Sequence, residues 1–171
     1  YEAMCSITSG GNNSAFGLNA LATVTSNGGN TAVGRDALKT NTGSNNTAIG
    51  WQSLYTNGTA NSNVAVGTSA LYTNTASHNV GVGQQALCLN TTGSCNTAMG
   101  YQVADNITSG ANNTFIGYHA GDGLTTGSNN TGVGCNAMGT NAMTGSFNSS
   151  LGANALQKVT SGEQNSALGD G

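Results

Sequence analysis

The pentapeptide Asn-x-x-apolar-Gly recurs ten times in this chain of 171 residues, and it limits the possible folds more than any other feature. An Asn lies four places before each repeat glycine, and an apolar residue lies directly before it. The glycines follow one another at intervals of 16 to 18 residues, at Gly17, Gly34, Gly50, Gly67, Gly83, Gly100, Gly117, Gly134, Gly152 and Gly169. Columns that stay in phase over ten copies indicate a repeat architecture in which each unit packs on its neighbours.

Each repeat predicts two short strands joined by two polar turns, with positions counted from the glycine as position 0; the first strand covers −4 to 0 and the second lies around +4. Position −3 holds Thr, Ser or Val, position −2 is mostly Ala or Gly, and position −1 is always apolar. This alternation is typical of a half-buried strand. We expect the −1 column to form the core and the small −2 and 0 residues to form a surface for lateral association. The predicted core column is Phe16, Val33, Ile49, Val66, Val82, Met99, Ile116, Val133, Leu151 and Leu168.

A second apolar column, mostly Leu, lies at position +4, and the glycine-containing polar segment after it reads as a turn. A helical repeat is excluded because every unit carries glycine and turn residues at fixed places. The predicted fold is therefore all-β: a parallel β-solenoid or β-roll of ten coils of about 17 residues, in a single repeat domain over 1–171.

Stacking at the strand spacing of ~4.8 Å also explains the composition. Like charges at that spacing repel, and only 5% of the residues are charged. Asn, Thr and Ser columns instead form hydrogen bonds along a stack, and the chain contains no Pro, which could not donate to a ladder.

Charge and hydropathy argue against several classes of partner. With a net charge of −3 and three basic residues, the chain cannot form the positively charged surface that binds nucleic acid or an anionic membrane. No apolar run approaches the length that membrane insertion requires. The two histidines and six acidic residues form no recognisable catalytic motif, so we expect a protein that is not an enzyme and holds no cofactor.

Two acidic residues share one column, because Asp105 and Asp122 both occupy position +5 of neighbouring coils. Two carboxylates about one coil apart should raise one pKa or recruit a cation, and calcium prefers such oxygen ligands. The pair is a candidate calcium site, and repulsion tolerated in solvent is the alternative.

The cysteines offer one candidate disulfide. Cys88 and Cys95 lie at the two ends of the turn "CLNTTGSC" within one coil, and a bond across this turn is sterically feasible. A disulfide bond of this kind is typical of small extracellular folds with a thin core. Cys5 and Cys135 lie seven coils apart, so they are expected to be free thiols or intermolecular links.

Exposed aromatic residues are expected to stack in short ladders. Tyr55 should lie over Tyr72, Tyr101 over Tyr118, and Trp51 next to Tyr55. Such columns stack on sugars or on a neighbouring filament, or they stabilise the sheet alone.

The units "NTAIGWQSL", "NVAVGTSAL" and "NTAVGRDAL" resemble the head repeats of trimeric autotransporter adhesins. In that family an N/S-x-A-I-G-x-x-A motif builds a left-handed parallel β-roll from three chains. Similar longer units occur in viral and phage tail-fibre proteins. The resemblance implies trimer formation and binding to matrix, although the coil of this chain is longer and the neck, stalk and anchor segments are not seen.

Together these features predict an extracellular structural or adhesive fibre segment, on a virion, on a cell surface or secreted. We expect a homo-oligomer or filament formed by lateral and end-to-end β stacking, because residues 1–4 match 101–104 in phase. One alternative is an adhesin head that binds a glycan or host-surface protein through its Trp and Tyr columns. Another is an ice-binding solenoid, because Thr recurs at position +8, as at Thr42, Thr75 and Thr91.

Overall fold

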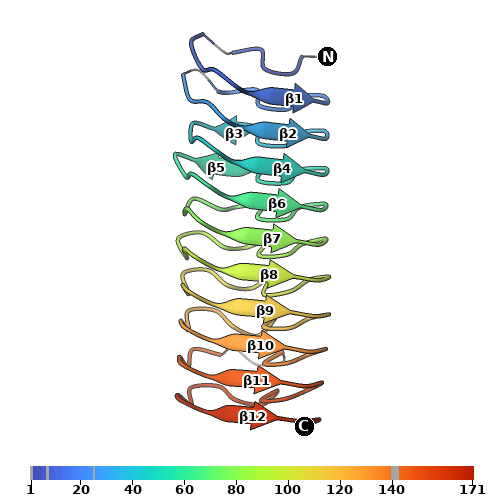
Figure 1. The fold of residues 1–171 in the computed structure, drawn as a ribbon, viewed down its shortest axis with the longest axis vertical. Helices are drawn as coiled ribbons and strands as arrows, with labels where there is room; N and C mark the ends of the chain where they lie inside the picture. Colours follow the sequence, from blue (N-terminus) through green and yellow to red (C-terminus); the bar gives the residue numbers. More distant parts are fainter. Residues whose placement is uncertain (1, 7, 25, 140–142) are drawn as a thin grey trace.

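The computed structural model describes residues 2–6, 8–24, 26–139 and 143–171, so Tyr1 of the predicted end match lies outside it. The described chain is an all-β parallel solenoid, as the repeat predicts, with about nine stacked coils where ten were expected (Figure 1). None of its described segments is a helix able to cross a membrane.

Ten strands, one from each repeat, form a single parallel sheet along the stack (Figure 1). The strands are β1 (Ser14–Phe16), β2 (Thr31–Val33), β4 (Thr47–Ile49), β6 (Val64–Val66), β7 (Val80–Val82), β8 (Thr97–Met99), β9 (Thr114–Ile116), β10 (Thr131–Val133), β11 (Ser149–Leu151) and β12 (Ser166–Leu168). Two further strands, β3 (Thr40–Asn41) and β5 (Thr56–Gly58), pair in a second small sheet. Each strand of the main sheet pairs with the same three positions of the next, so every sequence column becomes a column in space.

The predicted core column faces outward, which corrects the expected orientation of the strands. Between the end strands, Val66, Val82 and Val133 are half-buried, and the other side chains at −1 are between 39% and 53% exposed. The outward residues are Phe16, Val33, Ile49, Val66, Val82, Met99, Ile116, Val133, Leu151 and Leu168. The small residues at −2 point inward instead, so they are not the surface for lateral association.

The narrow width of the coil explains this reversal. Leu residues at +4 and Ala residues at +3 fill the interior, and they face the −2 position from the opposite wall. A Cβ added to Gly81 at −2 would lie 3.2 Å from Leu71 Cγ and 3.1 Å from the Ala86 carbonyl oxygen. Only small side chains fit there, apart from one exception described below.

A tight turn replaces the second strand expected around position +4. In a typical coil Gln52 at +2 and Leu54 at +4 have φ values of 56° and 47°, which an extended strand does not allow. Gly50 at position 0 has φ of 133°, and a Cβ there would meet the Gly67 carbonyl oxygen of the next coil at 2.6 Å. The repeat glycine is therefore fixed both by its dihedral angle and by the close approach of the next coil.

Buried Asn side chains at −4 link every coil to the next, as the expected polar ladder requires. Asn46 Oδ1 accepts a hydrogen bond from the backbone N–H of Asn63 at 3.0 Å. Its Nδ2 donates to the carbonyl oxygen of Ala60, at a corner of the next coil, at 2.9 Å. The same two links recur from Asn13 to Asn148. An amide is needed because it supplies an acceptor and a donor from one side chain.

A second internal Asn ladder runs through only four coils, at position +7. Asn57 Nδ2 donates to Asn41 Oδ1 at 2.7 Å, Asn74 continues the ladder, and Asn90 Nδ2 donates to Asn74 Oδ1 at 2.7 Å. The next coil has buried Ile107 at this position. Asn90 Oδ1 is consequently buried without a hydrogen-bond partner.

Phe115 is the one large side chain at −2, and two glycines make room for its buried ring. Gly121 occupies position +4 of the following turn, where most coils have Leu, and Gly132 occupies −2 of the next coil. A Cβ on Gly121 would lie 2.6 Å from the ring, and one on Gly132 would lie 2.7 Å from it. The missing Leu in the +4 column is thus replaced by Phe115.

We predict that Asn96→Ala strongly destabilises the solenoid. The substitution leaves the Asn113 N–H and the Gly110 carbonyl oxygen without their partners, at about 1–3 kcal/mol for each buried group. Urea denaturation followed by circular dichroism measures the loss. The control is Asn112→Gly at an exposed neighbour with φ of 58°, a conformation that glycine adopts freely. Similar losses in both variants would contradict a structural role for the −4 ladder.

We also predict that Phe115→Ala costs about 3–5 kcal/mol by opening a cavity. Gly121→Leu alone should destabilise as well, because its side chain would overlap the Phe115 ring. The double variant restores the usual Leu at +4 beside a small −2 residue, so it should recover most of the stability. A double-mutant cycle from denaturation curves measures this coupling. Additive losses would show that the side chains at positions 115 and 121 do not fill the same space.

Candidate functional site

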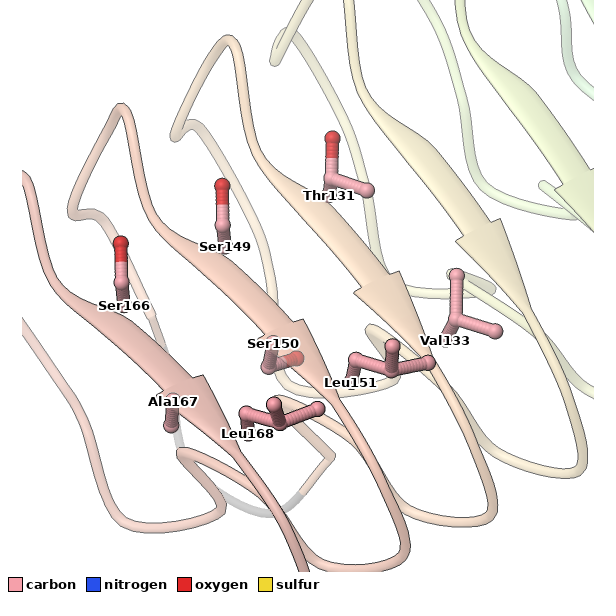
Figure 2. A pocket seen from close by; sticks show the side chains of 8 residues that line it. All are labelled: Thr131, Val133, Ser149, Ser150, Leu151, Ser166, Ala167 and Leu168. Atoms are coloured by element: carbon pink, nitrogen blue, oxygen red, sulfur yellow. The ribbon is translucent and has the colours of Figure 1, made fainter.

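The outer face of the main sheet is a regular surface that runs along the ten strands. We define this outer face as the side chains at −3 and −1 of the ten strands. Figure 2 shows its two rows over β10 to β12, with hydroxyls from Thr131, Ser149 and Ser166 in one row. Apolar side chains, including Leu151 and Leu168, form the other row. A shallow hollow of about 360 Å³ lies over these strands.

The tyrosine ladders predicted from the sequence are present. Tyr55 and Tyr72 stack with ring centroids 5.0 Å apart and planes 14° apart, and Lys39 Nζ lies 5.2 Å from the Tyr55 centroid. Tyr101 and Tyr118 stack at 5.6 Å with planes 9° apart. Both geometries follow from identical positions in successive coils, so they stabilise the stack while leaving ring edges and faces accessible.

Trp51 and His119 differ from expectation in their partners. The Trp51 side chain is half-exposed, but within the described chain it forms no ring contact with Tyr55. His119 packs edge-on against Tyr118 at 4.2 Å and thereby joins the second tyrosine pair to the acidic pair described next. The sequence alone places His119 in solvent, because its column gives no signal of these contacts.

Asp105 and Asp122 lie together, as predicted, and Asn106 connects them. Asn106 Nδ2 donates to Asp105 Oδ1 at 2.9 Å and to Asp122 Oδ1 at 2.7 Å. His119 Nδ1 lies 3.3 Å from Asp122 Oδ2. Carboxylate oxygens are suitable calcium ligands. However, no group of three or more His, Cys, Asp or Glu able to hold a metal occurs among the described residues.

Partial burial and the neighbouring Asp122 change the acidity of Asp105. Burial disfavours the charged carboxylate, and the hydrogen bond and negative charge of Asp122 act in the same direction. Together they raise the pKa of Asp105 to about 8. The raised pKa of Asp105 is the effect expected of one carboxyl group when two share a column.

Sequence reasoning did not find the cluster of charged side chains around the buried carboxylate of Asp36. Its carboxylate accepts a hydrogen bond from Asn19 at 2.9 Å and forms ion pairs with Lys39 at 3.1 Å and Arg35 at 3.2 Å. The Asn19 hydrogen bond, followed by the two cations, holds the pKa of Asp36 below its usual value against the opposing effect of burial. The one available signal is that Arg35, Asp36 and Lys39 belong to a single repeat.

The predicted disulfide between Cys88 and Cys95 is absent from this structure, in which all four cysteines are free thiols. The corner between the two residues folds inward around Gly93, whose carbonyl oxygen accepts hydrogen bonds from Asn90 and Asn79. The cysteines remain at the outer ends of this corner. Burial, and secondarily Asp105, raises the pKa of Cys88, which keeps it a neutral thiol.

Five of the described threonines at +8 donate their hydroxyl protons to carbonyl oxygens of the next coil, namely Thr42, Thr75, Thr91, Thr108 and Thr125. Thr42 Oγ1 donates to the Gly58 carbonyl oxygen at 3.1 Å, and Thr75 Oγ1 donates to that of Thr91 at 2.7 Å. Each hydroxyl therefore uses its only proton within the stack, which leaves acceptor positions for water.

Comparisons of the chain with protein-family models, curated proteins and solved structures found no match. The fold places the chain in the class of parallel β-solenoid repeat proteins.

We predict that thermal stability falls as the pH rises from 5 to 8.5. The pKa of Asp105 is raised on folding, so the stability it contributes is complete below about pH 4 and is lost as the pH passes through about 8. Asp36 stays ionised in this range because its pKa is lowered. Differential scanning calorimetry should show a flatter profile for Asp105→Asn. Exposed Asp170→Asn should keep the original slope, and equal slopes in wild type and Asp105→Asn would refute the raised pKa of Asp105.

Proposed function

We propose that the chain is a non-enzymatic structural or adhesive fibre segment that assembles by lateral and end-to-end β stacking. The observation that carries the proposal is the uninterrupted register of ten parallel strands, with an internal Asn link between every pair of coils. A stack of this kind gains length without changing its cross-section, because each new coil repeats the same contacts. Length and rigidity are the properties that a fibre requires.

Two further observations support assembly. Backbone groups in each coil bond to the coils on both sides, so the same pattern can continue from one stack into another. The exposed apolar column at −1 offers a surface for sideways contact. The resemblance of the repeat units to adhesin-head and tail-fibre repeats favours an extracellular or virion location and suggests oligomers of such chains.

Binding of a glycan or host protein is the second candidate function. It is favoured by the nearly parallel Tyr101–Tyr118 stack, which keeps both rings partly exposed on one edge of the solenoid. Sugar rings stack on such aromatic surfaces.

Electron microscopy of the purified chain tests the fibre proposal. We expect straight, unbranched filaments or bundles, and fibre diffraction should give an axial spacing of ~4.8 Å from stacked coils. Globular single particles at every concentration would contradict it. If such particles also bound a glycan array and lost binding on Tyr118→Ala but not on Leu89→Ala, the second function would replace the first.

A further inference from the structure

The outer face of the main sheet carries a continuous apolar column that nothing in the described chain covers. Its side chains include Val33, Ile49, Met99 and Ile116, each about 40% exposed. The neighbouring −3 column consists of Ser, Thr and two Val residues, so neither column contains a charge. Ten rungs at ~4.8 Å and a strand width of ~10 Å give a face of about 500 Å². The largest apolar patch on a soluble monomer is typically about 300–600 Å² and often functional, and the apolar column is the larger-chain half of a face of this size.

The regular spacing of the rungs on the outer face limits which partners can bind along its full length. A partner can contact all ten rungs equally only if its own structure repeats at the coil spacing. A second copy of this chain meets that condition, because its strands follow the same register. The lack of charge on the face also removes the repulsion that would oppose contact between identical surfaces.

Symmetry determines how two such faces meet. A two-fold rotation axis parallel to the stack keeps the two coil axes parallel. In that arrangement each apolar column faces the hydroxyl column of the partner. If the two-fold lies along the strands, the axes are antiparallel, and apolar residues meet apolar residues while hydroxyls meet hydroxyls. The second arrangement buries the apolar column without placing it against polar groups, and an isologous contact of this kind closes on itself.

We propose that the outer face docks on the same face of a second copy, with the two coil axes antiparallel. The inference rests on the lateral association in the proposed function and names its surface and geometry. About 1,000 Å² is buried in total, at the lower limit for a specific interface, so the dimer is weak and depends on concentration.

Sedimentation velocity over a range of concentrations tests the surface. Wild type should shift from monomer to dimer as the concentration rises, whereas Ile49→Asp should remain monomeric. Because Ile49 faces solvent in the single chain, its thermal melt should be unchanged. The control is Leu89→Asp, since Leu89 is 46% exposed against 41% for Ile49 but lies outside the outer face. Leu89→Asp should dimerise like wild type.

A monomer at all concentrations, a trimer, or unimpaired dimerisation of Ile49→Asp would overturn the inference. These outcomes are distinct from failure of the fibre proposal. Filaments or bundles that persist in Ile49→Asp would leave the fibre intact and place lateral contact on another surface.

Spin-label distances test the antiparallel arrangement. Single labels are placed at Thr31, Thr97 and Ser149, on three different rungs, after the native cysteines are replaced by Ser. With antiparallel axes the offset along the stack between equivalent labels changes by twice the coil spacing, ~10 Å, for each rung. The three distances therefore cannot all be equal. Parallel docking gives the same distance at all three rungs, and that result would refute the orientation.

Discussion

The amide of the Asn at −4 holds the solenoid in register, and the direction of every neighbouring side chain depends on it. Its oxygen accepts from the backbone of the next Asn, and its nitrogen donates to a corner carbonyl, as Asn79 does with Asn96 and Gly93. These bonds require the −4 side chain to point inward. Strand alternation then places −2 inside and both −3 and −1 outside. The exposed apolar column is therefore a consequence of a buried polar one.

The interior of the solenoid is filled in two different ways along the stack, by hydrogen-bonded Asn side chains and by apolar side chains. In the middle coils the +7 residues are Asn and bond to one another, whereas Ile107 and Leu124 form an apolar interior in later coils. The change leaves one unpaired oxygen, on Asn90, at the boundary. Phe115 enters the core in the apolar half, where Gly121 and Gly132 provide space. The backbone tolerates both interiors because the −4 ladder continues through each of them.

The sequence was sufficient to predict the fold but not which face of the strand is buried. Periodicity shows that −1 and −3 share one face, and hydrophobicity suggests that the more apolar face is inside. That rule fails here because a buried amide with all its partners costs little, while Leu at +4 leaves no width for Val or Ile opposite. Column positions did predict the Tyr55–Tyr72 stack and the Asp105 pair. Contacts within one coil, such as the ion pairs of Asp36 with Arg35 and Lys39, depend on the turn conformation and could not be read from the columns.

The solenoid separates its uncharged surface from its titratable groups. The Asp36 cluster, Asp105 and Asp122 all lie at +1, +2 or +5, on the turn after the repeat glycine, whereas the outer face holds only hydroxyl and apolar groups. Protonation of Asp105 changes the stability of neighbouring coils without adding charge to the outer face. Contacts on that face therefore depend on its shape and its period. Since every coil repeats both, the strength of lateral contact grows with the number of coils, and a long stack can associate firmly through an interface that is weak in each repeat.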